Sequence, residues 1–196
     1  MLFQIPAANE PLLRALRAAA AAENGQLHLI DFGGSLGSTW WQHRPWLEAI
    51  PSVRWSVIEQ PALVAAGQRE FTMGPVRYFT SIEECGATER PTLVLLSSVL
   101  PYLEDPHGLL REIGRRPFRR LIIDRTGFVA RGRDRLTVQQ VPPSIYQASY
   151  PCRFFDRAGL IADLGPGWRL VAEWENGDDV DIDAEYCGMM LERHAP

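Results

Sequence analysis

The sequence contains no lysine, because all 20 of its basic residues are arginine. The absence of lysine excludes a lysine Schiff base, a P-loop lysine and a lysine general base. Cysteines are also few: the three present are far apart and form no Cys-x-x-Cys pair. The four histidines show no ligand spacing, so we expect no disulfide framework and no bound metal. This cysteine usage favours a reduced, cytoplasmic setting.

Long apolar runs are missing as well. The alanine run at 18–22 is far shorter than the ~20 apolar residues that a membrane span needs, and charged residues flank it. We therefore expect no membrane-spanning or targeting segment. A net charge of −4 gives no general attraction to nucleic acid or to an anionic membrane. The partner expected is a small molecule, and the sequence gives no information on the oligomeric state.

What is present is a chain of 196 residues with 46% hydrophobic residues, enough for one domain over residues 1–196. Short apolar runs alternate with helical patterns, which predicts an α/β fold with a parallel, doubly wound sheet. The expected strands cover 27–31, 53–58, 76–79, 92–97 and 121–124, and the expected helices cover 10–24, 39–50, 61–71 and 106–116.

The alternation stops after the fifth strand. Residues 125–155 show no clean period, and so long a stretch inside a domain predicts a functional lid or insertion. A helix over 156–164 and strands over 168–174 and 186–193 complete the expected fold. The acidic segment between these two strands is interpreted as a solvated hairpin loop, since it lacks the pattern of an EF-hand.

The most informative stretch runs from Gln26 to Trp41 and predicts a strand, a glycine-rich turn and a helix that starts at Ser38 or Thr39 with a hydroxyl N-cap. Such a turn makes a small-molecule site in an α/β sheet. A dinucleotide is one hypothesis, but G-x-G-x-x-G spacing is missing and Asp31 would repel a pyrophosphate. A serine hydrolase is a second hypothesis, because residues 33–37 satisfy G-x-S-x-G around Ser35.

S-adenosylmethionine explains more residues than either alternative. Asp31, at the end of the first strand, can take the methionine ammonium, and the amides of Gly33, Gly34 and Gly37 can pack against the amino-acid end. Glu59, at the end of the second strand, can accept hydrogen bonds from both ribose hydroxyls. Both acids stand where ligands of open α/β sheets bind.

Four strings of residues also resemble a bacterial family of class I methyltransferases associated with polysaccharide and other biosynthetic clusters. They cover 57–61, 95–106, 123–126 and 136–151. The resemblance implies a Rossmann-like fold with a seven-stranded, mostly parallel sheet in the order 3-2-1-4-5-7-6, whose last strand is antiparallel. Two positions depart from it: Gly127 stands where proline is expected, and Arg153 where tryptophan is expected.

The candidate cofactor residues follow the ends of the expected strands. Besides the residues of the turn, they are Glu59, Gln60, Ser81, Ile82, Ser97, Ser98 and Val99. Methylation of a hydroxyl needs a base, for which Asp124, at the end of the fifth strand, is the first candidate. His43, in the helix expected over 39–50, and Tyr146 in the insertion are further catalytic candidates.

The sequence thus predicts a methyltransferase that uses S-adenosyl-L-methionine and acts on a hydroxyl or amine of a sugar or other biosynthetic intermediate. Residues 125–155 would cover the acceptor site. The first alternative is a non-catalytic binding or scaffold domain with the same fold. The second is the serine hydrolase that uses Ser35.

Overall fold

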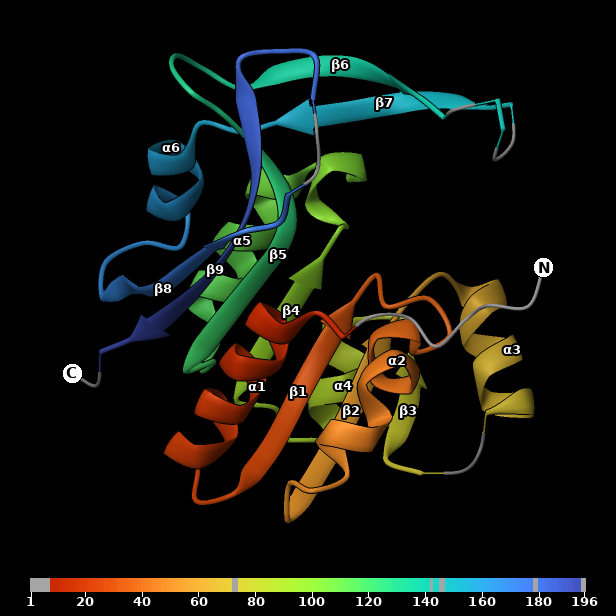
Figure 1. The fold of residues 1–196 in the computed structure, drawn as a ribbon. Helices are drawn as coiled ribbons and strands as arrows, with labels where there is room; N and C mark the ends of the chain where they lie inside the picture. Colours follow the sequence, from red (N-terminus) through yellow and green to blue (C-terminus); the bar gives the residue numbers. More distant parts are fainter. Residues whose placement is uncertain (1–7, 72–73, 142, 145–146, 178–179, 195–196) are drawn as a thin grey trace. The chain divides into compact units, whose positions relative to one another are not determined.

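A computed structural model describes residues 8–71, 74–141, 143–144, 147–177 and 180–194 (Figure 1). The chain forms two compact units, and each is built from two stretches of sequence. Unit 1 consists of Met1–Ser97 and Phe118–Ile122, and unit 2 of Ser98–Pro117 and Ile123–Pro196. Strand β5 (Arg120–Val129) begins in unit 1 and continues in unit 2. A single domain over the whole chain stays a prediction.

Unit 1 alternates helices and strands, as the sequence predicts. In chain order it contains α1 (Glu10–Ala22), β1 (Gln26–Phe32), α2 (Ser38–Leu47), β2 (Ser52–Ile58), α3 (Pro61–Glu70), β3 (Val76–Phe79), α4 (Ile82–Thr88) and β4 (Leu93–Ser97). Strand β1 pairs with β2 and β4, and β2 pairs with β3, all in parallel. The expected parallel sheet is therefore confirmed, and the short helix α4, capped by Ser81, lies between β3 and β4 in the chain.

Local sequence explains where the first helix begins and ends. The Asn9 side chain accepts a hydrogen bond from the N–H of Leu12 and so caps the N-terminus of α1. At the other end Gly25 has φ 81° and donates its N–H to the carbonyl of Ala20. The face that carries Leu12 and Leu16 is buried, which packs α1 into the core of unit 1.

Unit 2 holds the remaining elements. They are the 3-10 helix η1 (Leu100–Tyr102), α5 (Pro106–Arg115), the rest of β5, β6 (Arg135–Gln140), β7 (Ser149–Phe154), α6 (Arg157–Ala162), β8 (Trp168–Glu175) and β9 (Ala184–Arg193). Strands β8 and β9 pair antiparallel. Strands β6 and β7 form a separate antiparallel pair, which Figure 1 shows as an extended hairpin.

The order of the seven strands in the main sheet is β3-β2-β1-β4-β5-β9-β8. This differs from the expected 3-2-1-4-5-7-6 in the numbers of its last two strands. The reason is that, within the described ranges, β6 and β7 pair only with each other, so the strands that follow them in the sequence become the eighth and ninth. The antiparallel pairing of the last strand agrees with the expectation.

Much of the stretch 125–155, for which the sequence shows no clean period, is regular structure, and its role as a lid over the acceptor site stays a prediction. Residues 125–129 continue β5, and the hairpin β6–β7 pairs Thr137 with Cys152 and Gln139 with Tyr150. Both apolar residues of β6 are exposed, Leu136 by 64% and Val138 by 67%, whereas Thr137 and Gln139 are half-buried. Residues 136–139 alternate apolar and polar as in a strand, but a run of four residues is too short to stand out in a stretch without a clean period.

A histidine ties three parts of unit 2 together. The His107 ring, in α5, bonds through Nδ1 to Oδ2 of Asp163 at 2.5 Å and through Nε2 to Oδ2 of Asp134 at 2.7 Å. Burial alone would lower the pKa of His107, but the hydrogen bonds and charges of the two carboxylates overcome burial and raise the pKa above 6.5. Because both ring nitrogens face acceptors, the pair of bonds favours the protonated ring. Asp134 directly precedes β6, so this ion pair anchors the hairpin.

Among the described residues no helix is long and apolar enough to span a membrane.

Candidate functional site

The carboxyl ends of four parallel strands meet at one edge of unit 1. Phe32 of β1 is in register with Ile58 of β2, and Ile58 is in register with Phe79 of β3. Asp31 is also in register with Leu95 of β4. The residues that follow these strands therefore lie along one edge, which is where open α/β sheets bind ligands. The structure brings together most of the residues that the sequence proposes for the cofactor.

The glycine turn after β1 depends on backbone that favours glycine. Gly33 has φ 72° and Gly37 has φ 82°. The N–H of Gly37 donates to the carbonyl of Gly34 at 2.9 Å, which closes the turn. Helix α2 begins at Ser38, as expected, but its N-cap is Gly37 rather than a hydroxyl residue, and no side chain caps the helix. The N-terminus of α2 therefore keeps backbone N–H groups that no side-chain cap occupies.

The side chain of Asp31 lies beneath this turn and is 1% exposed. Its Oδ2 accepts a hydrogen bond from Nε1 of Trp55 at 2.9 Å. A Cβ on Gly34 would stand 2.5 Å from Cγ of Asp31, so only glycine allows this approach. Burial raises the pKa of Asp31 to about 7, the Trp55 hydrogen bond opposes the rise, and the charge of Glu59 adds to it.

Aromatic side chains also stabilise the turn, by hydrogen bonds to its backbone. The carbonyl of Leu36 accepts two hydrogen bonds, from Nε1 of Trp41 at 3.1 Å and from the hydroxyl of Tyr78 at 2.9 Å. Sequence analysis missed Trp55, Trp41 and Tyr78 as supports of this site. The only available signal was an indole or phenol group in a segment expected to be buried, since such groups need a hydrogen-bond partner there.

The residues proposed after β2 and β3 differ in what their side chains do. Glu59 follows β2 directly and is half-buried, and its Oε2 accepts the N–H of Gln60 at 2.6 Å. The exposed Gln60 is the N-cap residue of α3. The hydroxyl of Ser81 accepts from the N–H of Glu84 and caps α4, while Ile82 is buried. Of the four proposed residues, Glu59 has the side chain best placed to bind a ligand.

Ser97, the last residue of β4, belongs to unit 1, and Ser98 and Val99 begin unit 2. Ser98 is exposed with φ 54°, and its N–H donates to the carbonyl of Asp124 at 3.0 Å. This left-handed serine turns the chain sharply after a buried strand.

The side chain of Asp124 supports the local structure of β5 through hydrogen bonds. Its side chain is fully buried, and Oδ1 accepts from Nε1 of Trp174 at 2.9 Å and from Nδ2 of Asn176 at 3.1 Å. The Oδ1 of Asn176 in turn accepts the N–H of Arg125, whose φ is 48°. Asp124 and Asn176 thereby hold Arg125 in the left-handed conformation within β5, and the side chain of Arg125 is exposed.

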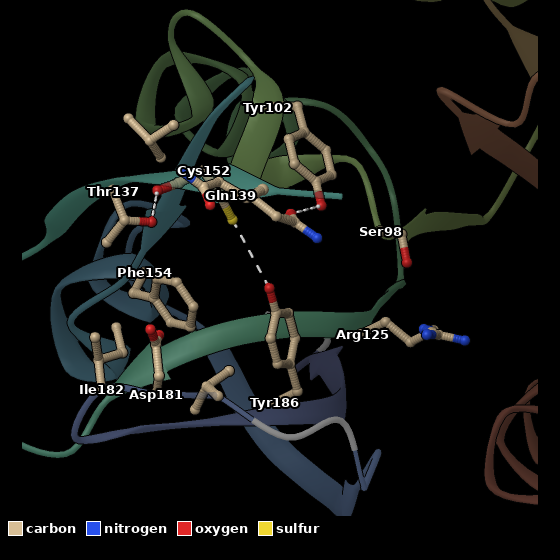
Figure 2. Close-up of a pocket in the computed structure, with 13 residues that line it drawn as sticks. Ser98, Tyr102, Arg125, Thr137, Gln139, Cys152, Phe154, Asp181, Ile182 and Tyr186 are labelled. Carbon is tan, nitrogen blue, oxygen red and sulfur yellow. Dashed lines mark hydrogen bonds between the residues drawn. The ribbon is translucent and has the colours of Figure 1, made fainter. Parts of the chain in front are cut away.

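A cavity of about 930 Å³ lies within unit 2 (Figure 2). Thr137, Gln139, Cys152 and Phe154 of the hairpin line it, together with Tyr102 and residues of the segment before β9. The hydroxyl of Tyr102 donates to Oε1 of Gln139 at 2.9 Å, and the hydroxyl of Tyr186 points toward the sulfur of Cys152. Ser98, Arg125 and Asp181 also line it. Hydroxyl, amide and charged groups thus alternate with aromatic rings around the cavity.

The other two catalytic candidates are His43 and Tyr146, and the structure describes only the first. The Nε2 of His43 accepts the N–H of Asn9 at 3.0 Å, and Nδ1 lies 2.8 Å from the carbonyl of Thr39. The buried ring joins α1 to α2, and both of its nitrogens are engaged, which argues against a role in proton transfer. Tyr146 lies outside the described residues.

Ser35 has φ 53° and is exposed in the turn. In the described part of unit 1 no histidine nitrogen hydrogen-bonds its hydroxyl: His43 is engaged as above, and Nε2 of His28 lies 3.4 Å from the hydroxyl of Ser52. A nucleophilic serine needs an adjacent base, so the hydrolase hypothesis loses support. Among the residues described, no group of three or more His, Cys, Asp or Glu side chains is placed to hold a metal ion.

The fold is that of Rossmann-like α/β methyltransferases, as a comparison with solved structures shows. The N-terminal domain of EvdMO1 in the presence of SAH and D-fucose is 17% identical with a TM-score of 0.59, over 97% of this chain and 85% of that one. Magnesium protoporphyrin IX methyltransferase (ChlM) from Synechocystis PCC 6803 with bound SAH is 14% identical with a TM-score of 0.59, over 94% and 82%.

A third similar structure is the glycopeptide N-methyltransferase MtfA complexed with S-adenosyl-L-methionine, 10% identical with a TM-score of 0.61, over 98% of this chain and 90% of that one. No protein-family model and no curated protein sequence matches the chain. Identities this low establish the fold, and a shared fold by itself does not establish an activity.

Proposed function

We propose that this protein is a methyltransferase that uses S-adenosyl-L-methionine and acts on a small-molecule acceptor. The observation that carries the proposal is the edge of unit 1, where the glycine turn over Asp31 and the carboxylate of Glu59 follow adjacent parallel strands. The similar structures support it, since EvdMO1 and ChlM were solved with SAH and MtfA with S-adenosyl-L-methionine.

Each part of the donor has a matching group in unit 1. The two oxygens of Glu59 suit the two ribose hydroxyls, and Gln60 orients that carboxylate through its N–H. The turn of Gly33, Gly34 and Gly37 offers backbone close to the methionine end, and Asp31 beneath it offers negative charge to the ammonium. A bound ammonium would favour the ionised form of Asp31 and lower its raised pKa.

In methyl transfer an oxygen or nitrogen lone pair of the acceptor forms a bond to the methyl carbon while the bond from carbon to sulfur breaks. The products are the methylated acceptor and S-adenosylhomocysteine, and the acceptor proton passes to a base or to water. Because this is a single displacement, positioning of the two reactants supplies much of the rate. A positioned base adds typically ~10²–10⁴-fold.

We assign the acceptor to the 930 Å³ cavity of unit 2. Gln139, Thr137 and the tyrosine hydroxyls suit an acceptor with several hydroxyl or amine groups, and Phe154 offers a flat apolar wall. A sugar has this mixture of polar edges and apolar faces, and EvdMO1 was crystallised in the presence of D-fucose. Asp181 lines the cavity and is exposed, so we propose it as the proton acceptor in place of the enclosed Asp124.

Calorimetry with S-adenosylhomocysteine tests the donor site. The protein should bind it, and Glu59→Ala should weaken binding roughly 10- to 100-fold, because two hydrogen bonds to a charged group are lost. The matched control is Glu70→Ala, an exposed acid of the same unit paired only with Arg69 in the described chain, which should bind normally. No binding by the intact protein, or equal binding by both variants, would overturn the proposal.

The acceptor half needs a separate measurement. Transfer of label from methyl-labelled S-adenosylmethionine to a panel of amino and deoxy sugars should occur with the intact protein and fall in Asp181→Asn. Binding of the donor without transfer to any acceptor would favour the non-catalytic binding domain instead.

A further inference from the structure

A second cavity of about 710 Å³ lies within unit 2, between the segment that begins with η1 and the hairpin β6–β7. Pro101 and Leu103 line one side, and Leu136, Pro151 and Arg153 line the hairpin side. The pairing of the hairpin places Leu136 opposite Arg153. Since side chains alternate along a strand, these residues share the face opposite to Thr137, Cys152 and Phe154, which line the first cavity.

The walls of this cavity are apolar and accessible. Leu136 is 64% exposed, and Val138, which lies on the same face but lines the first cavity, is 67% exposed. Two large aliphatic side chains side by side on a two-stranded hairpin leave apolar surface in water, with no third strand to cover it. A contiguous exposed apolar patch beside a cavity is a common mark of a ligand site.

One cation stands among these apolar walls. The Nε of Arg153 is buried and has no hydrogen-bond partner, and nowhere in the described chain does Arg153 have an acidic side chain within ion-pair distance. Glu104 lines the same cavity without pairing with it. Because Arg153 is half-buried, lines the cavity and has no acidic partner in the described chain, an anion in the cavity would supply the counter-charge that its guanidinium lacks. The planar guanidinium suits a carboxylate in particular, because it can donate two parallel N–H bonds.

We propose that this cavity binds a small organic carboxylate with an apolar body. The carboxylate pairs with Arg153, and the hydrocarbon part lies against Leu136, Leu103 and Pro151. This cavity shares Tyr102 with the proposed acceptor cavity, and binding of its ligand does not depend on methyl transfer. Its recognition combines one charge with a large apolar contact, so a ligand needs both parts to bind well.

A charge series on one hydrocarbon body tests the proposal with the full-length protein. We would measure binding of 4-phenylbutyrate, 4-phenylbutanol and 4-phenylbutylamine by calorimetry. The carboxylate should bind best and the amine worst, and Arg153→Gln should weaken the carboxylate about tenfold while leaving the alcohol nearly unchanged. Arg131→Gln, at an exposed arginine outside the cavity, is the matched control and should change neither.

A second variant keeps the test decisive if Arg153→Gln does not fold. Leu136→Ser changes a largely exposed side chain and should weaken the acid and the alcohol alike. Equal binding of the three probes to the intact protein would overturn the proposal, as would undiminished carboxylate binding by a folded Arg153→Gln. Binding of S-adenosylhomocysteine by the same variants should stay normal, so failure here is distinguishable from failure of the proposed methyltransferase activity.

Discussion

Gly34 and Asp31 are in such close contact that a Cβ on Gly34 would stand 2.5 Å from both Cγ and Oδ2 of the aspartate. The turn can therefore close over the carboxylate only because residue 34 has no side chain. Its neighbour Gly33 serves a different need, since its φ of 72° favours glycine. Two adjacent glycines are thus required for two distinct physical reasons.

Gly34→Ala should destabilise the protein by about 1–3 kcal/mol, because the turn or the carboxylate must move to admit the methyl group. It should also weaken binding of S-adenosylhomocysteine, since the turn would no longer close. Chemical denaturation and calorimetry measure the two effects. Gly86→Ala is the matched control: nothing lies within 4 Å of its Cβ position in α4, so it should be neutral or stabilise by about 0.5–1 kcal/mol.

Trp55→Phe should cost about 1–3 kcal/mol more than Trp40→Phe, because it leaves the buried carboxyl of Asp31 without its indole donor. The two tryptophans form a good pair for comparison. Both are buried, their rings lie 5.8 Å apart, and Nε1 of Trp40 has no hydrogen-bond partner. Equal losses in urea denaturation would show that the bond to Asp31 contributes nothing.

The unfolding free energy should carry a pH dependence from Asp31. Burial raises its folded pKa from 3.8 to about 7, so the folded state holds the proton more tightly than the unfolded chain does. The resulting stabilisation is present at low pH and is lost as the pH rises through about 7. Asp31→Asn should remove this part of the profile and be more stable than the original protein at pH 8. Parallel stability profiles of the two proteins would contradict the assignment.

His107 should add a second pH-dependent contribution. Because Asp163 and Asp134 raise its folded pKa above 6.5, the stabilisation is full below that pH and is lost as the pH rises through the folded pKa. The protection factors of the hairpin amides, which correct for the pH dependence of intrinsic exchange, should therefore fall in that range in the original protein and stay constant in His107→Gln. The control His194→Gln, at an exposed histidine, should retain the original dependence.

The sequence by itself determined the alternation of elements in unit 1 and the position of the glycine turn. It could do so because buried parallel strands are continuous apolar runs and because glycine is required where φ is positive. It also placed Asp31 and Glu59 at strand ends, which fixes their edge of the sheet. These features depend on residues close together in the chain.

Only the tertiary structure decided which polar groups meet. Trp55 is 24 residues from Asp31, and Trp174 is 50 residues from Asp124, so no local pattern announces either hydrogen bond. The same holds for Nε2 of His43, which accepts the N–H of Asn9 from 34 residues away. The pairing of β6 with β7 likewise brings together residues that are distant in the chain, such as Leu136 and Arg153. Contacts between distant residues are set by packing, which a single sequence does not state.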